Sequence, residues 1–368
     1  MIKKLILIII FVLTLTGCWD QRIYERTGFI LEFGAETGKD KKLLITYSLP
    51  VVGTERKNQV EIDTVEGNVL RESREEARTT SSKLLEGGKV QQVLFSDELA
   101  EKGIHNVEEL LFRDPMAPAM SFVTVVDGSP RTLIEKASTF SDKPIPALYI
   151  NQLITNNINH GYSMDSSITY FEICYYTEGL DPITPLIKLE DKDIKVLGSA
   201  LFSGDKMVGT ISTKQTSQLI ALMNKLPKTE YIFPSPTNVE KQTSQKDGMA
   251  VTIKEEKSKI DVAMTGKQAE VNISLSLKVD LDEYQWDDTD NVDVQKKLEA
   301  FMSKQLNQDI LSTISYTQSV GSDPLGVGDM LRAKYFSHFK DSDLKRLYEN
   351  AKVTVNTKVT IDKFGITR

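Results

Sequence analysis

Histidine, cysteine and carboxylate side chains carry out most metal binding and acid–base catalysis in proteins. In this chain few of these residues have the spacing that a metal site or an acid–base pair requires. It contains three histidines, His105, His160 and His338, and none has another histidine or cysteine at metal-ligand spacing. The adjacent acids Glu108 and Glu109 face different sides of a helix, so they make a poor acid–base pair. We therefore expect neither a zinc site nor a two-carboxylate active site.

Two other stretches resemble ligand-binding loops only superficially. The acidic run Asp287–Asp293 lacks the central glycine and the distal glutamate of a calcium loop, and Asp290 or Asp293 is better placed to cap a helix. The glycines of Gly321–Gly328 follow no strand and precede no lysine, so they do not match the phosphate-binding pattern. We expect this stretch to turn the chain rather than to contact a partner. With no nucleophile motif either, the sequence predicts no cofactor, no metal and no enzyme activity.

The stretch that does indicate a covalent reaction is Leu15–Cys18. It follows two lysines and the apolar run Leu5–Leu13, which is the arrangement of a secretory signal. The pattern resembles a bacterial lipoprotein signal, in which the cysteine becomes the first mature residue and carries lipid. A single transmembrane anchor is the alternative, but the apolar run is shorter than the ~20 residues that span a bilayer. We expect residues 1–17 to be removed and Cys18 to be lipidated.

The body that follows Cys18 has the composition of an ordinary globular protein. The chain has 368 residues with 45 basic and 52 acidic side chains, so loss of Lys3 and Lys4 leaves a net charge of about −9. This acidity argues against nucleic acid as a partner and against general adhesion to anionic lipid. Once Cys18 is lipidated only Cys174 remains, in an apolar run typical of a buried thiol, so no disulfide is expected within the chain.

Strand and helix patterns alternate through residues 18–190, which predicts a mixed α/β domain there. The expected strands are Gly28–Gly34, Leu43–Val52, Val90–Phe95, Met120–Val126 and Ser167–Thr177. The expected helices are Gly67–Leu85, Asp97–Lys102, Val107–Phe112, Thr132–Ala137 and Pro146–Asn157.

Residues 191–235 predict a small middle region made of a hairpin and a helix. The strands Ile194–Phe202 and Met207–Ile211 flank turn residues, and Ser217–Leu226 has a helical pattern. The polar stretch Asn238–Gly248, with the prolines before it, is the best linker candidate in the chain.

Residues 240–368 predict an α+β domain in which two helices cover one face of an antiparallel meander. Every odd position from Val271 to Leu281 is apolar and every even one is polar, which is the pattern of a half-buried strand. Met249–Ile253 and Ile260–Met264 alternate in the same way and complete the expected meander. An apolar stripe from Leu298 to Ile314 predicts the first helix, and a second ends near Tyr348. The fold class is therefore mixed α/β and multi-domain.

Four stretches, in the right order along the chain, resemble the Ger(x)C family, the lipoprotein C subunits of spore germinant receptors. Gly17–Glu25 resembles the family's Gly-Cys-Trp-Asp start, and Leu111–Pro115 its Arg-Asp-Pro turn. Gly198–Gly209 is similar to its Ala-x-Phe-x-x-Asp-x-x-Val-Gly hairpin. Gly321–Asp329 looks like its Gly-x-Asp-Pro-x-Gly-x-Gly signature.

The resemblance implies a non-enzymatic receptor subunit that is lipid-anchored through Cys18 to the outer face of the spore's inner membrane. Its implied partners are a membrane-embedded A subunit and a transporter-like B subunit, with no nucleic acid. The implied fold is several small mixed α/β domains, in agreement with the patterns above. Two other functions remain as alternatives on the residues alone: a lipoprotein that binds a solute for a transporter, and a cell-wall enzyme on a lipid tether.

Overall fold

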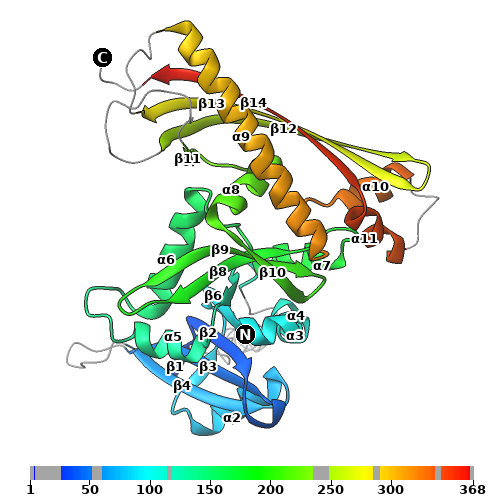
Figure 1. Cartoon of the computed structure of the whole chain (residues 1–368). Helices are drawn as coiled ribbons and strands as arrows, with labels where there is room; N and C mark the ends of the chain where they lie inside the picture. The colour runs from blue at the N-terminus through cyan, green and yellow to red at the C-terminus, as the bar shows by residue number, and fades with distance from the viewer. Residues whose placement is uncertain are drawn as a thin grey trace.

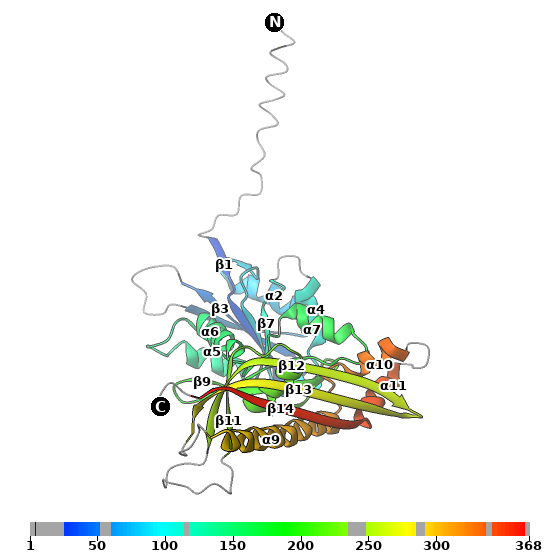
Figure 2. The same cartoon turned by 90° about the horizontal axis from the view of Figure 1, so that it is seen from above.

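Two β-sheets stacked end to end form the body of the molecule. The computed structural model describes residues 26–51, 60–113, 118–234, 248–284, 291–335 and 341–364, together with Lys4. Figures 1 and 2 show the N-terminal sheet at one end and the C-terminal sheet with the long helix α9 at the other. The strand β1 and the helix α2 lie at the end farthest from the C-terminal sheet.

In the described part of the chain the N-terminal sheet has eight strands in the order β10-β9-β8-β7-β6-β2-β3-β4. Its central pairs β2–β6, β6–β7 and β7–β8 are parallel, and its outer pairs are antiparallel. The strands are β2 (Glu32–Thr37), β3 (Leu43–Pro50), β4 (Val60–Gly67), β6 (Gln92–Ser96), β7 (Phe122–Val126), β8 (Ile183–Leu189), β9 (Ile194–Ser203) and β10 (Lys206–Ser212). A separate pair joins β1 (Thr27–Phe29) to β5 (Leu84–Glu86) in parallel.

Helices cover both faces of this sheet, because the central strands are apolar on both sides. The first face packs against α2 (Leu70–Thr80), α3 (Asp97–Lys102), α4 (His105–Arg113) and α7 (Ile168–Tyr176). The second face packs against α5 (Pro130–Ala137) and α6 (Pro146–Asn159). The short helix η2 (Lys39–Lys41) lies between β2 and β3.

The C-terminal sheet has, among the described residues, four strands in the order β11-β12-β13-β14. They are β11 (Thr229–Phe233), β12 (Met249–Thr265), β13 (Gln268–Glu283) and β14 (Lys352–Phe364). Burial alternates along β13 as expected, with the odd positions from Val271 to Leu281 buried. The helices of this half are α8 (Thr213–Leu222), α9 (Val292–Ser319), α10 (Val327–Tyr335) and α11 (Asp341–Glu349). Only one face of the sheet is covered, since the even positions of β13 stay largely exposed.

The mixed α/β fold class is confirmed, but the predicted strand at Ser167–Thr177 is wrong. That stretch is the helix α7, and the Ser167 hydroxyl caps it by accepting the N–H of Tyr170 at 3.1 Å. Apolar residues occupy every side of this segment, so its hydrophobic periodicity does not separate helix from strand. The helix predicted over Gly67–Leu85 is also too long. It ends at Thr80, and Leu85 lies in β5, where it pairs with β1.

The predicted antiparallel meander is corrected as well. Met249–Thr265 is one long strand whose pairing with β13 continues past two register shifts, so the two short strands expected there are one. The last strand, β14, runs parallel to β13, which makes the sheet mixed. The cap of α9 is Asn291, which accepts the N–H of Asp293 at 2.9 Å. The expected second helix is divided into α10 and α11.

The cores of the two halves meet without a gap. The apolar cluster of the C-terminal sheet extends through α8 to Ile183, Leu201 and Ile211, which belong to the last strands of the N-terminal sheet. The hairpin expected at residues 194–211 is present as β9 and β10, and it completes that sheet. The proposed division at residue 190 thus falls inside one sheet, and most of the proposed linker, residues 235–247, lies outside the described residues.

Candidate functional site: the junction of the two sheets

Three loops from distant parts of the chain meet where the two halves join. One links α7 to β8 and holds Gly179 and Asp181. The second is the β9–β10 turn around Gly204, and the third follows α9 and holds Asp323. We call these three loops the junction. Two of them are motifs of the sequence resemblance, and the structure places them together.

Asp181 is the centre of the junction. Its Oδ1 accepts the N–H of Gly204 at 2.7 Å, and its Oδ2 accepts the N–H of Asp323 at 2.8 Å. The N–H of Asp181 donates in return to the carbonyl of Asp323 at 3.0 Å. One carboxylate therefore ties the β9–β10 turn to the loop that follows α9.

Asp323 uses its side chain to organise its own loop. The carboxylate is only 4% exposed, and it accepts the N–H groups of Val327 at 3.0 Å and Gly328 at 2.7 Å. These N–H groups belong to the first turn of α10, and the N–H groups of a first turn have no acceptors within their own helix. The acid of the Gly-x-Asp-Pro signature thus starts the helix that follows it.

Glycine is required where the two halves touch most closely. Gly179 has a φ of +78°, and a Cβ on it would lie 2.5 Å from the amide nitrogen of Asp329. That amide donates to the Gly179 carbonyl at 3.1 Å. The backbones of Gly179 and Gly328 therefore meet directly, with no room for a side chain between them.

The β9–β10 turn also holds elements on its other sides. Asp205 accepts the backbone N–H of His105 with its carboxylate at 3.3 Å, which ties the turn to the start of α4. Lys345 on α11 donates to the Ser203 hydroxyl at 2.5 Å. The turn therefore contacts both the helical layer of the N-terminal half and the last helix of the C-terminal half.

Burial sets the electrostatics of the junction. It raises the pKa of Asp323 to about 7, although the N–H groups of Gly328 and Val327 act in the opposite direction. Burial also raises the pKa of Asp181, against the N–H bonds from Asp323 and Gly204. Both carboxylates are occupied by backbone amides, so this arrangement is suited to holding segments together rather than to proton transfer with a substrate.

The structure separates the residues that sequence reasoning examined for chemistry. His105 is mostly buried with its Nδ1 3.4 Å from the Glu172 carboxylate, while His160 is exposed at the end of α6. His338 and Cys18 lie outside the described residues. Within the described ranges, no group of three histidine, cysteine or acidic side chains could hold a metal ion. Cys174 is buried as predicted.

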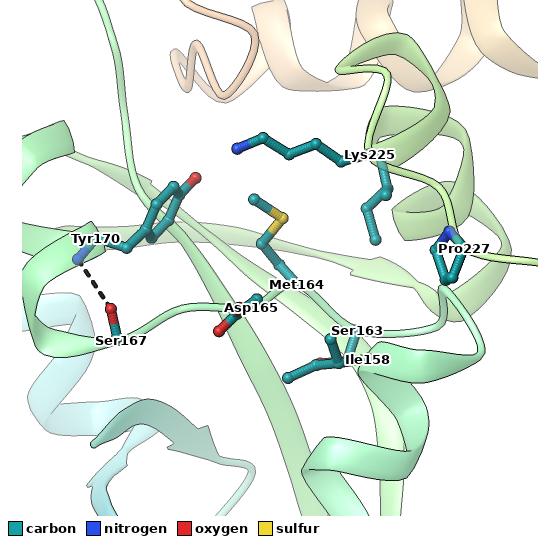
Figure 3. A pocket seen from close by; sticks show the side chains of 9 residues that line it. Ile158, Ser163, Met164, Asp165, Ser167, Tyr170, Lys225 and Pro227 are labelled. Carbon is teal, nitrogen blue, oxygen red and sulfur yellow. Dashed lines mark hydrogen bonds between the residues drawn. The ribbon is translucent and has the colours of Figure 1, made fainter. Parts of the chain in front are cut away.

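A small cavity of about 350 Å³ lies between the α6–α7 loop and the end of α8 (Figure 3). Met164, Tyr170 and Lys225 surround it. Ser163 also lines it, with a buried hydroxyl that has no hydrogen-bond partner among the described residues. Asp165 is exposed at its rim. The lining holds one acid and one base but no activated nucleophile.

Both halves of the chain match spore germination families. The model described as the spore germination protein N-terminal domain matches residues 20–189, and the one described as spore germination B3/GerAC like, C-terminal, matches residues 197–365. The chain belongs to this family of spore germination proteins. The family that the four sequence motifs predicted is therefore confirmed.

Individual relatives agree with this assignment. Spore germination protein GerQC of Bacillus cereus is 23% identical over 368 residues, which is 99% of this chain and 99% of GerQC. The putative spore germination protein YfkR of Bacillus subtilis (strain 168) is 19% identical over 389 residues, covering 99% of this chain and 97% of YfkR. The crystal structure of the GerBC protein matches with a TM-score of 0.55 and 16% identity, covering 90% of this chain and 96% of GerBC, which shows a shared fold.

Sequence reasoning missed the partner of the glycine signature. Gly204 and Asp323 stood in recognised motifs, but Asp181 lies in an unremarkable Gly-Leu-Asp-Pro stretch 142 residues before Asp323. The available signal was the pair of Asp-Pro steps, Asp181-Pro182 and Asp323-Pro324, each preceded by a glycine two residues earlier. Such steps mark turns, but nothing in them indicates that the two turns meet.

Proposed function

We propose that this chain is the lipid-anchored C subunit of a nutrient germinant receptor. In this proposal diacylglyceryl Cys18 holds the body on the outer face of the spore's inner membrane, beside the membrane-embedded A and B subunits. The body supports receptor assembly or relays the signal, and it carries out no chemical reaction and binds no cofactor or metal. Residues 1–17 are removed, so that the mature chain begins at Cys18.

The observation that carries this proposal is the Leu15–Cys18 motif directly before a chain whose two halves both match spore germination families. Two acyl chains on one sulfur are enough for durable membrane attachment, at ~0.8 kcal/mol for each buried CH₂. A tether of this kind raises the local concentration of the body beside its partners, so that weak contacts suffice. No helix in the described ranges is long and apolar enough to cross a bilayer.

The junction supports the relay part of the proposal. Hydrogen bonds between Asp181 and Asp323 join the N-terminal and C-terminal halves, and an apolar core runs across the same boundary. The two sheets are therefore joined by polar and apolar contacts, which a relay of a signal through the body requires.

The test removes the lipid anchor by substituting Cys18 in spores that carry this receptor. Cys18→Ala should move the protein from the membrane fraction to the soluble fraction or abolish its accumulation, and it should slow germination with the cognate nutrient. Cys174→Ala is the matched control, because it removes the other cysteine and leaves the anchor intact. Normal germination of Cys18→Ala spores, or mass spectrometry showing an unmodified Cys18 in the native protein, would contradict the proposal.

A further inference from the structure

A cavity among the described residues of the N-terminal half combines apolar side chains with arginines. It has a volume of about 610 Å³ and lies between the first face of the N-terminal sheet and the helix α2. Its inner wall is apolar, with Phe33, Ile45 and Val93 from the sheet and Ala77 from α2. The cavity opens to the surface, and its volume is within the range of pockets that bind small ligands.

Four arginines line the mouth of this cavity. Arg71, Arg74 and Arg78 follow one another at helical spacing on α2, and Arg113 comes from the end of α4. Arg78 is paired with Glu75 and Arg113 with Glu109, and Glu86 also lines the cavity. Exposed ion pairs of this kind are weak, so an anionic ligand can exchange with their carboxylates. The combination of an apolar interior and a cationic rim matches a ligand with a long apolar chain and an anionic head.

Three residues that directly precede lining residues in the sequence have exposed apolar side chains. Val69 precedes the lining residue Leu70 and is 53% exposed, and Leu84 precedes Leu85 and is 47% exposed. Phe112, which precedes Arg113, is 47% exposed. Surfaces that contact a lipid layer have apolar side chains together with arginines.

The cavity also lies near the start of the folded body. Ile30, which lines it, directly follows β1, and β1 lies at the end of the molecule opposite the C-terminal sheet (Figure 2). Eight residues lie between Cys18 and Thr27, so the two are at most ~32 Å apart when the chain is fully extended. If Cys18 carries lipid as proposed, the mouth of the cavity is within reach of the membrane surface.

We propose that this cavity binds the acyl chain of an anionic amphiphile, with the carboxylate or phosphate head held by the arginines at its rim. A free fatty acid and an anionic phospholipid both have this chemistry. The binding does not require the anchor, so it can be tested apart from the proposed receptor function.

The experiment uses residues 19–368, which retain every helix and strand described above. A dansyl-labelled fatty acid reports entry into an apolar site by its fluorescence, and palmitate competes with it. We expect one saturable site per chain, displaced by palmitate and more weakly by its methyl ester. Co-sedimentation with phosphatidylglycerol vesicles, compared with phosphatidylcholine vesicles, then distinguishes a bilayer lipid from a free fatty acid as the source.

Two variants locate the site. Ala77→Leu places extra carbons in the cavity and should weaken binding by roughly tenfold. Arg71→Glu reverses one charge at the exposed rim, which leaves the core unchanged, and should weaken palmitate binding by roughly fivefold without affecting the methyl ester. Arg131→Glu is the charge control, since Arg131 lies on α5 against the opposite face of the sheet.

Thermal unfolding shows whether each variant is folded. Absence of saturable binding to the folded wild-type chain overturns the proposal. So does equal affinity of the wild-type, Ala77→Leu and Arg71→Glu proteins, because the ligand would then lie elsewhere. Palmitate binding that is weakened by Arg71→Glu and unchanged by Arg131→Glu supports it.

Discussion

Asp181 and Asp323, 142 residues apart in sequence, form a closed pair of hydrogen bonds through their backbones and one side chain. The N–H of Asp323 donates to Asp181 Oδ2 at 2.8 Å, and the N–H of Asp181 donates to the Asp323 carbonyl at 3.0 Å. Because each aspartate belongs to a loop of a different half, this pair links the two halves directly.

Removal of the Asp323 side chain should destabilise the protein strongly. Asp323→Ala leaves the buried N–H groups of Val327 and Gly328 without acceptors, which should lower the free energy of unfolding by about 3 kcal/mol. Urea denaturation followed by circular dichroism measures the change. Asp191→Asn, at an exposed position, is the control and should change stability by less than about 0.5 kcal/mol. A loss of similar size in both variants would contradict the role assigned to Asp323.

The stability of the protein should carry a pH dependence from Asp323. Its pKa is about 7 in the folded state and near 3.8 when unfolded, so the folded state binds the additional proton between these values. The contribution of Asp323 is therefore full below about pH 4 and is lost as the pH rises to about 7, at up to ~1.4 kcal/mol per pH unit. Unfolding free energies of the wild type and Asp323→Asn should therefore differ least near pH 4 and diverge as the pH rises to about 7, because only the wild type loses stability on ionisation.

Glu32 should contribute a second, separate pH dependence of the same sign. It is fully buried in the N-terminal sheet, and burial raises its pKa to about 7 although Gln92 and Ser48 donate hydrogen bonds to it. Glu32→Gln should therefore flatten the fall in stability between about pH 4.5 and pH 7. The double variant with Asp323→Asn should flatten it further, since the two sites share no partners. Both assignments would be refuted if the free energy of unfolding changed with pH to the same extent in the wild-type protein and in the double variant.

The close contact at Gly179 should tolerate no side chain. Gly179→Ala combines a left-handed backbone conformation with a Cβ 2.5 Å from the Asp329 amide, and we expect a loss of about 3 kcal/mol. Gly266→Ala is the matched control, because its φ is +67° and no atom lies within 4 Å of the new Cβ. That variant should lose only about 1 kcal/mol. Equal losses would mean that backbone conformation alone, and not contact between the halves, explains the requirement for glycine.

Cys174 should be unreactive in the folded protein. It is 1% exposed, and burial raises its pKa to about 11, so both access and thiolate formation are suppressed. Iodoacetamide at pH 8 should modify it at least ~100-fold more slowly in the native protein than in urea, as followed by mass spectrometry of its peptide. Rapid labelling of the native protein would show that α7 opens readily.

The features that the sequence alone determined depend on neighbouring residues. The Leu15–Cys18 motif, the family signature at Gly321–Asp329 and the alternation along Val271–Leu281 are all readable within about ten residues. The alternation needed only the two-residue period of a strand, and the structure confirms its buried face. The turn at Gly321–Gly328 was predicted from its glycines and proline, and Gly321 and Gly326 both have positive φ.

Tertiary structure decided whatever depends on contacts between distant residues. Ser167–Thr177 is a helix because its capping serine and its packing outweigh the strand propensity of its aromatic side chains. The parallel direction of β14 depends on the helices that return the chain to β13. Asp181 became significant only when folding placed it against Asp323, since a hydrogen bond between two loops has no local pattern in either of them.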